Sequence, residues 1–320
     1  MSPSDPATGR ELAARLRDGD LSAAPAVLNL VESRTASARE QTRELLAALS
    51  PGQLGAEPPG QIVGVTGPPG VGKSSLLSRL VAEWRDRGRS VAVLAVDPSS
   101  RRSGGSLLGD RARIERDPDD SRVFIRSTAA GERLGGLAPA TRAAAGALAV
   151  AFDVVVIETV GVGQSETEVA DLADTVAVVV QPGSGDVLQF LKSGIMEIPD
   201  VLVVTKADLG QVAIRAQGDL RAALHSLGAG TAVLAVSSLA PGTGIPELVD
   251  ALDAHRAGLD LGARRLHSRR AHALADFAAE HGERGLRALG GRREAERWLA
   301  AQAADADVAS LVHALELRTH

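Results

Sequence analysis

The chain contains, at residues 67–75, the run Gly67-Pro68-Pro69-Gly70-Val71-Gly72-Lys73-Ser74-Ser75. This run fits the phosphate-binding loop pattern GxxxxGK[ST] at every constrained position. The apolar stretch 62–65 before it predicts a buried strand, and the spacing of large residues over 75–81 predicts a helix. Glycines let backbone N–H groups turn towards a phosphate, and the helix adds the positive end of its dipole. All nine residues are therefore predicted to surround the phosphates of a nucleoside triphosphate.

Two side chains of this run have separate predicted roles. Lys73 would reach the β- and γ-phosphates, and Ser74 would offer its hydroxyl to Mg²⁺. Lys73 is therefore a predicted catalytic residue that neutralises charge, and Ser74 a predicted metal ligand.

Composition narrows the class of protein. The 320 residues include no cysteine, which excludes disulfides, thiolate metal sites and a cysteine nucleophile. A net charge of −5 and few aromatic residues (four Phe, two Trp, no Tyr) argue against a nucleic-acid binder. No signal-peptide core opens the chain, and no uncharged stretch approaches the length of a membrane span. We expect a soluble, cytoplasmic protein without a membrane or nucleic-acid partner.

Apolar runs alternate with helical patterns through the middle of the chain. Such alternation predicts an α/β P-loop NTPase fold, with a mostly parallel, doubly wound sheet flanked by helices. Helical patterns at both ends predict an N-terminal extension over 1–55 and a C-terminal extension over 257–320, around a nucleotide domain over 56–256. The predicted strands are 61–66, 91–96, 122–126, 153–158, 175–181, 200–205 and 231–236, and the predicted helices between them are 75–87, 136–151, 186–197 and 211–227.

A second motif follows the predicted strand 200–205. The run Val203-Val204-Thr205-Lys206-Ala207-Asp208 is similar to the guanine-specificity element NKxD of GTPases, with Thr205 in place of Asn. The carboxylate of Asp208 would accept hydrogen bonds from guanine N1 and from its exocyclic amine, while the stem of Lys206 would cover the base. Adenine has no such pair of donors. The motif therefore predicts a guanine nucleotide, GTP or GDP.

Two weaker signals complete the predicted GTP site. Ser237, Ser238 and Leu239 follow the last predicted strand, and their position matches the loop whose backbone amides and Ser face the guanine carbonyl in GTPases. The strand 153–158 ends in Glu158, which could orient Mg²⁺ or its water shell. Gly161 then allows the backbone close to a γ-phosphate, and Gln164 is predicted to orient the attacking water, as in other GTPases.

Four strings together resemble the MeaB/ArgK family, the GTPase chaperones of adenosylcobalamin-dependent acyl-CoA mutases. The similarity covers nearly the whole chain, including the string Gly185-Asp186-x-Leu188-Gln189. The four strings are GPPGVGKSS at 67–75, VDPSS at 96–100, SGGSLLGD at 103–110 and ETVGVGQSE at 158–166.

The resemblance implies further site residues and partners. Asp97 and Asp110 match family acids near Mg²⁺ and the first switch, and Ser74 and Glu158 match the other metal-linked positions. Residues 184–193 match a further switch that responds to the partner mutase. Family members are homodimers through C-terminal helices. The implied function is a Mg²⁺-dependent GTPase that gates cofactor loading and protects and reactivates the mutase.

The sequence departs from the family at several positions. Val187, Phe190 and Ser193 replace the family's acid, glycine and lysine in the loop 184–193, and Thr205 replaces Asn. These departures indicate a divergent paralogue that serves a different mutase.

Three alternatives stay open beside this interpretation. A metal-insertion GTPase would usually carry a His-rich or Cys metal site, and this chain has neither. A kinase acting on a transport component would most naturally use ATP, against which Asp208 argues. A nucleotide-binding scaffold without turnover is the third, and a hydrolysis assay separates it from a GTPase.

The remaining charged side chains are interpreted as surface residues. No histidine stands out as a general base, and His225, His255 and His267 are predicted at the surface. The arginine pairs 264–265 and 269–270 indicate an acidic partner or a salt-bridged dimer face, with solvent exposure as the favoured interpretation.

Overall fold

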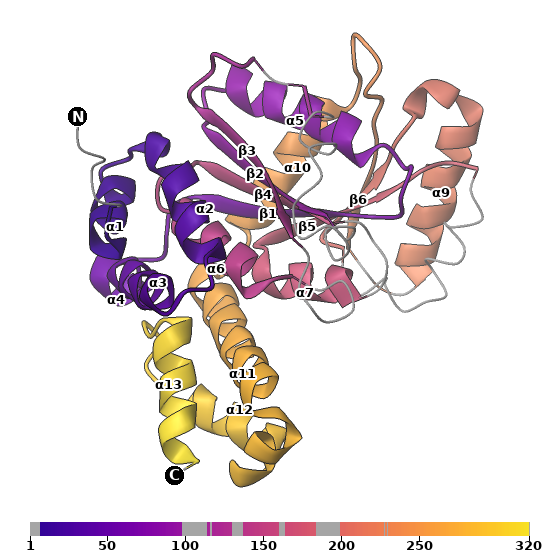
Figure 1. Ribbon diagram of the computed structural model, residues 1–320. Helices are drawn as coiled ribbons and strands as arrows, with labels where there is room; N and C mark the ends of the chain where they lie inside the picture. Colours follow the sequence, from indigo (N-terminus) through magenta and orange to yellow (C-terminus); the bar gives the residue numbers. More distant parts are fainter. Residues whose placement is uncertain are drawn as a thin grey trace. The chain divides into compact units, whose positions relative to one another are not determined.

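The protein divides into two compact units (Figure 1). The helical unit contains residues up to 60, residues 139–151 and residues from 260 onward, and the sheet unit contains 61–138 and 152–259. The structure, a computed structural model, describes residues 7–97, 114–115, 117–129, 137–159, 164–183, 199–226, 228 and 230–319.

Seven strands form the sheet unit's core, and every neighbouring pair is parallel. The strand order is β3-β2-β4-β1-β5-β6-β7. The predicted α/β class and parallel, doubly wound sheet are therefore confirmed. The strands are β1 (Gln61–Thr66), β2 (Val91–Asp97), β3 (Val123–Ala129), β4 (Val154–Glu158), β5 (Thr175–Val180), β6 (Val201–Val204) and β7 (Ala232–Ala235).

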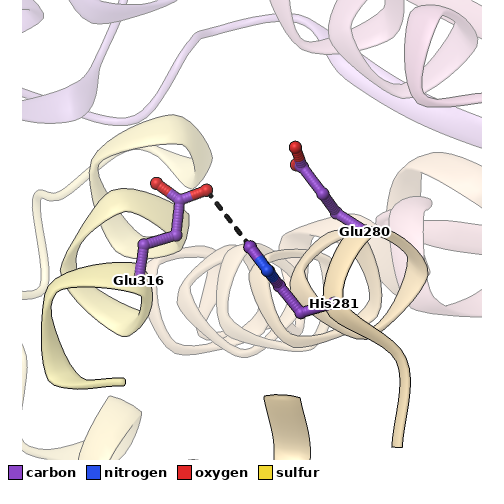
Figure 2. Close-up of side chains that lie close together, drawn as sticks. All are labelled: Glu280, His281 and Glu316. Carbon is purple, nitrogen blue, oxygen red and sulfur yellow. Dashed lines mark hydrogen bonds and ion pairs between the residues drawn. The ribbon is translucent and has the colours of Figure 1, made fainter. Parts of the chain in front are cut away.

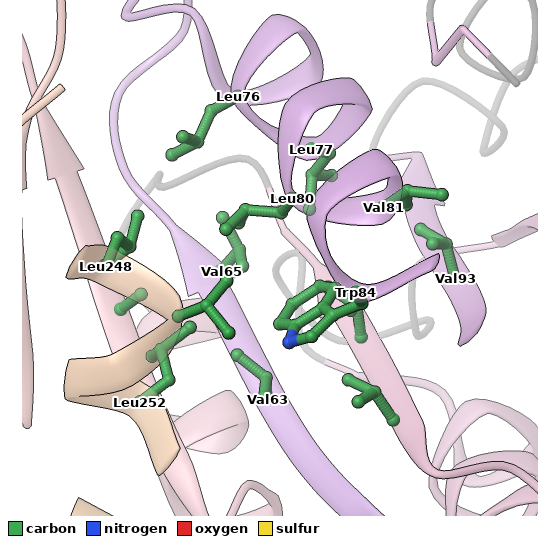
Figure 3. Packing of buried hydrophobic residues seen from close by; sticks show 14 of the residues in the cluster. Val63, Val65, Leu76, Leu77, Leu80, Val81, Trp84, Val93, Leu248 and Leu252 are labelled. Carbon is green, nitrogen blue, oxygen red and sulfur yellow. The ribbon is translucent and has the colours of Figure 1, made fainter. Parts of the chain in front are cut away.

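Helices cover both faces of this sheet because alternate strand residues point to opposite sides. On one face Val63 and Val65 of β1 pack against α5 (Lys73–Asp86) and α10 (Ile245–Ala257) (Figure 3). On the other face Gly64 lies against α7 (Gln164–Leu172), so closely that a Cβ would come within 2.9 Å of Val169. The remaining sheet-unit helices are η5 (Ala207–Leu209) and α9 (Gln211–Ser226).

The apolar stripe of α5 fixes this helix on the sheet. Leu76, Leu80 and Trp84 recur every fourth residue and are all buried, next to Val63 and Val65 (Figure 3). Full burial of each such side chain contributes about 1.5–3 kcal/mol. The stripe therefore holds the first turn of α5, with Lys73, at one end of β1.

The strand order places a topological switch at β1. The chain continues from β1 to β2 on one side of it and to β5, β6 and β7 on the other. Ligands of doubly wound sheets bind beyond the carboxyl ends of the strands at such a switch. The loop 67–72 leaves the carboxyl end of β1 at this point.

The helical unit combines segments that are far apart in sequence. Helix α6 lies between β3 and β4 in sequence, yet it packs with α2 and α3 of the N-terminal segment. Helices α1 and α3 approach so closely that a Cβ at Gly9 would lie 1.9 Å from the carbonyl oxygen of Gln41. The helices are α1 (Gly9–Arg17), η1 (Leu21–Ala23), α2 (Ala24–Glu32), α3 (Ala36–Ala48), α4 (Pro51–Leu54), α6 (Pro139–Leu148), α11 (Leu261–Ala288), α12 (Arg292–Ala300) and α13 (Val308–Arg318).

An apolar cluster joins α11, α12 and α13, with Phe277 and Leu315 fully buried. At its edge His281 of α11 faces Glu316 of α13, with Nε2 3.4 Å from Oε1, and Glu280 lies beside them (Figure 2). This pair is partly exposed, so its contribution to stability is small. Gly282 next to it has φ 62° and interrupts the helical backbone of α11.

No helix among the described residues has both the length and the apolar character of a membrane span.

The predicted exposure of the two arginine pairs is wrong for Arg265 and Arg269. Arg265 is buried, and its guanidinium donates to the carbonyl oxygens of Pro58 and Gly60 at 2.6 Å each. Arg269 pairs with Glu57 at 2.9 Å. The segment 57–60 forms neither a helix nor a strand, and the two arginines of α11 donate to two of its carbonyl oxygens and to the carboxylate of Glu57.

A buried polar group lies between α6 and α11. Arg142 of α6 pairs with Asp276 of α11, and His272 lies one turn before Asp276. Nε2 of His272 has no hydrogen-bond partner among the described residues, and Nδ1 is 3.5 Å from Oγ of Ser268. Burial, with the nearby charge of Arg142, lowers the pKa of His272 to about 3, and burial raises the pKa of Asp276.

We expect His272 to make the helical unit sensitive to acid. Its pKa is lower in the folded state than in the unfolded chain, so the unfolded chain takes up the proton first as the pH falls. The free energy of unfolding is therefore constant with respect to this group above pH 6.5 and decreases as the pH falls towards 3. The loss at pH 5 is about 2 kcal/mol. Amide exchange of 261–288 at pH 7.5 and pH 5 measures it. His272→Gln should show a smaller acid loss than wild type; equal losses would contradict the prediction.

Candidate nucleotide-binding site

The loop 67–72 joins β1 to α5, and its backbone has the positive φ that favours glycine at three positions. Gly67 has φ 149°, and a Cβ there would lie 2.1 Å from the carbonyl oxygen of Val179. Gly72 has φ 97° and precedes the first turn of α5. The loop therefore curls tightly over the helix N-terminus, where N–H groups and the helix dipole favour a phosphate.

The ammonium of Lys73 lies within the curve of this loop. Nζ donates to the carbonyl oxygens of Gly67 at 2.7 Å and Pro68 at 2.9 Å, and the residue is only 6% exposed. A positive charge held at this place, beside the loop amides, can neutralise the oxygens of a phosphate chain.

Hard oxygen donors meet beside the loop. Oγ of Ser74 lies 3.4 Å from Oε1 of Glu158, the last residue of β4 and a buried one. The hydroxyls of Thr66 and Thr159, at the same edge of the sheet, are buried and have no hydrogen-bond partner among the described residues. The hydroxyl of Ser74 and the carboxylate of Glu158 fit Mg²⁺, which prefers oxygen ligands and retained water.

Three predicted residues of the phosphate end have incompletely described positions. Asp97 is the last residue of β2, and Ala95 of the same strand is in register with Glu158 of β4. The backbone of Asp97 therefore lies at the same edge of the sheet as Glu158. Gln164 begins α7. Their side chains lie outside the described residues, as do Asp110 and the segment 184–193 with the predicted helix 186–197.

The guanine-type motif follows β6 at the same edge of the sheet. Lys206 has a left-handed backbone, φ 56°, which turns the chain sharply after Thr205. The ammonium of Lys206 donates to Oε1 of Gln181. Oγ of Ser237 donates to Oδ1 of Asp208 at 2.7 Å and so joins the two predicted base-binding segments.

These segments surround a pocket of about 480 Å³. It is lined by part of the phosphate loop, one face of α5, the guanine-type motif and the loop after β7. The sequence motifs include most of these residues, but they leave out Ser78, Arg79, Glu115 and Ala240. Ser78 and Arg79 stand three and four positions after Ser75, so helical spacing alone could have placed them on the same face. The lining residues are Val71, Gly72, Ser75, Ser78, Arg79, Glu115, Thr205, Lys206, Asp208, Ser238, Leu239 and Ala240.

Thr205 braces the phosphate loop from the base side. Its hydroxyl lies 2.7 Å from the carbonyl oxygen of Val71 and 3.1 Å from that of Val180. The side chain is buried, so water does not readily replace the hydroxyl at the carbonyl oxygen of Val71, whereas that of Val180 also accepts from the backbone N–H of Thr205. Thr205, which stands where the GTPase motif has Asn, therefore still connects the base end of the site to the phosphate loop through its side chain.

We expect Thr205→Val to weaken nucleotide binding by about 5- to 30-fold, because it removes this hydrogen bond without changing the shape of the side chain. Thr205→Ser keeps the hydroxyl and should bind within about 3-fold of wild type. Titration calorimetry with GDP measures both. Equal affinities for the Val and Ser variants would contradict a bracing role.

Comparisons with known proteins agree with this geometry. The family model described as "Methylmalonyl Co-A mutase-associated GTPase MeaB" matches residues 24–285. A probable GTPase of Mycobacterium tuberculosis is 41% identical over 274 residues, which are 83% of this chain and 80% of that protein. A putative GTPase of Pyrococcus abyssi is 46% identical over 199 residues, 62% of this chain and 59% of that protein. The chain thus spans less than two thirds of the archaeal relative.

A solved structure shares the architecture. The crystal structure of a LAO/AO transport system kinase matches with a TM-score of 0.64 and 28% sequence identity. The match covers 93% of this chain and 98% of that one. The predicted P-loop NTPase fold is confirmed over nearly the whole length.

Proposed function

The chain belongs to the MeaB family of methylmalonyl-CoA mutase-associated GTPases, and we propose that it hydrolyses GTP with Mg²⁺ and serves as the chaperone of an adenosylcobalamin-dependent acyl-CoA mutase. One observation carries the enzymatic part. The loop around Lys73, the Ser74–Glu158 pair and the Asp208 motif all lie at one edge of one sheet, and Asp208 shares a pocket with Gly72 and Ser75 on either side of Lys73 and Ser74. A phosphate end, a metal end and a base end are what hydrolysis of a bound GTP requires.

The protein's part in hydrolysis is positioning and charge neutralisation. Water attacks the γ-phosphate and GDP leaves, while charge develops on the transferred phosphoryl oxygens. Lys73 and the loop amides would stabilise this charge. Ser74 and Glu158 would hold Mg²⁺, with Asp97 and Asp110 as further proposed ligands, and the bound ion would neutralise and orient the β- and γ-phosphates. Gln164 is the proposed water-orienting residue.

The base end supports guanine as the bound base. Asp208 is acceptor-only when ionised, and guanine offers it two donors, N1–H and the exocyclic amine. Adenine offers no donor at N1, so it would leave the carboxylate without a partner on the base. The Ser237–Asp208 bond supports this assignment because it holds the carboxylate at the pocket wall.

The chaperone part rests on the family. GTP-bound and GDP-bound states would differ in affinity for the mutase, because a ligand shifts a protein's conformation only through differential affinity. Through this difference the chain would gate cofactor loading and protect and reactivate the mutase. We further propose a cytoplasmic homodimer that forms through residues 257–320.

Of the alternatives, the kinase has a specific observation behind it, because the similar solved structure is that of a transport system kinase. A kinase needs an acceptor and most naturally ATP, whereas Asp208 with Ser237 supports guanine. We therefore keep GTP hydrolysis as the proposed activity.

Titration calorimetry with non-hydrolysable GTP and ATP analogues in the presence of Mg²⁺ tests the nucleotide part. We expect tight binding of the GTP analogue, little binding of the ATP analogue, and loss of binding in Asp208→Ala. Equal binding of both analogues would overturn the guanine assignment and favour the kinase. Phosphate release with and without methylmalonyl-CoA mutase then tests turnover and partnership, and a chain that binds GTP but releases no phosphate would be a scaffold.

A further inference from the structure

Arg79 connects the phosphate-binding helix to the loop that lines the base end of the pocket. It lies on α5 six residues after Lys73 and contributes to the pocket wall. Its Nε donates to the carbonyl oxygen of Ser238 at 2.9 Å. The two residues are 159 positions apart in sequence, so this contact exists only in the folded sheet unit.

The contact is the first link of a polar relay that ends on the base-recognising carboxylate. The peptide bond between Ser238 and Leu239 accepts from Arg79 through its carbonyl, and its N–H lies 3.3 Å from Oγ of Ser237 as a donor. Oγ of Ser237 in turn donates to Oδ1 of Asp208 at 2.7 Å. Donor and acceptor alternate correctly along the whole chain, so each bond polarises the next.

The relay restrains the orientation of Asp208. A carboxylate on a short 3₁₀ turn can rotate about its side-chain torsions, and Asp208 is exposed. A fixed Ser237 hydroxyl holds one carboxylate oxygen and leaves the other for a ligand. Arg79 fixes the peptide that holds this hydroxyl, and it does so from the helix that begins at Lys73.

We propose that Arg79 is a positioning residue for base specificity, which sets the discrimination between guanine and inosine nucleotides through Ser238, Ser237 and Asp208. Inosine lacks the exocyclic amine of guanine, so the ratio of the two affinities reports how well the carboxylate is placed for that donor. The proposal rests on the proposed guanine site. It extends this site to a helix residue that no base-recognition motif contains.

Two variants separate the hydrogen bond from the charge. In glutamine Nε2 stands at the same place along the side chain as Nε in arginine, so Arg79→Gln keeps an N–H donor without the positive charge. Arg79→Met has similar length and no donor. Titration calorimetry with GDP and IDP, on the full chain, gives the affinity ratio for wild type and both variants. Thermal unfolding confirms that the variants are folded.

We expect Arg79→Met to lower the GDP-to-IDP preference by about 10-fold and Arg79→Gln to keep it within about 3-fold of wild type. An unchanged preference in Arg79→Met would overturn the proposal, and equal losses in both variants would overturn it in favour of the guanidinium charge. Asp208→Ala is the reference. If it leaves the preference unchanged, the proposed guanine site itself fails; if it removes the preference while Arg79→Met does not, only the role of Arg79 fails.

Discussion

Replacement of Lys73 by methionine is expected to lower the rate of GTP hydrolysis by at least about 100-fold. Methionine keeps most of the length of the side chain but carries no charge. The ammonium of Lys73 is buried and held by two loop carbonyls, at 2.7 and 2.9 Å, so the loop itself fixes the position of the charge that the variant removes. Single-turnover phosphate release at saturating GTP measures the chemical step separately from binding.

Lys73→Arg is the matched control for this experiment. Arginine keeps the positive charge, but its planar guanidinium cannot reproduce the two bonds of a compact ammonium to Gly67 and Pro68. We expect it to recover only a small part of the lost rate. A rate for Lys73→Met within about 10-fold of wild type would remove Lys73 from the proposed chemistry.

Replacement of Asp208 by asparagine is expected to change the preferred base from guanine to xanthine. The affinity for GDP should fall by at least about 100-fold, since two hydrogen bonds to a charged group are lost. Oδ1 of asparagine can still accept from Ser237, which turns the amide nitrogen towards the base. That nitrogen and the amine of guanine are both donors and cannot form a hydrogen bond with each other. Xanthine has a carbonyl at the same position, which can accept from the amide nitrogen.

Recovery of activity distinguishes this change of specificity from simple damage. Asp208→Asn should hydrolyse xanthosine triphosphate at a rate near that of wild type on GTP, because the phosphate end is untouched. Asp208→Ala offers neither an acceptor nor a donor and should use both nucleotides poorly. An asparagine variant that retains wild-type affinity for GDP would place the base elsewhere.

The fold and most of the site could be predicted because they depend on local patterns. Strands buried on both faces appear as continuous apolar runs, and the loop 67–75 has a backbone that only its glycines permit. The convergence of this loop with Asp208 and Ser237 also follows from the sequence, because the carboxyl ends of parallel strands meet at one edge.

The features that the sequence does not predict depend on contacts between distant segments. His255 is predicted at the surface, but it contacts Thr175 at 2.9 Å and Asp200 at 3.2 Å and is only partly exposed. The carbonyls that bury Arg265 come from 57–60, more than two hundred positions away. A charged residue on a helix gives no local signal of such partners. For the same reason the sequence does not predict the bond from Arg79 to Ser238, although helical spacing places Arg79 on the face of Ser75.

The position of α6 in the sequence limits which fragments of this protein can fold. Because α6 is encoded between β3 and β4, any fragment that contains the whole sheet also contains it. Its buried side chains, among them Ala144 and Leu148, pack against α2 and α3 of the first sixty residues. A fragment that starts at residue 61 would therefore expose an apolar helix to water and tend to aggregate. An isolated nucleotide domain would need the N-terminal helices, supplied in the same chain or as a separate peptide.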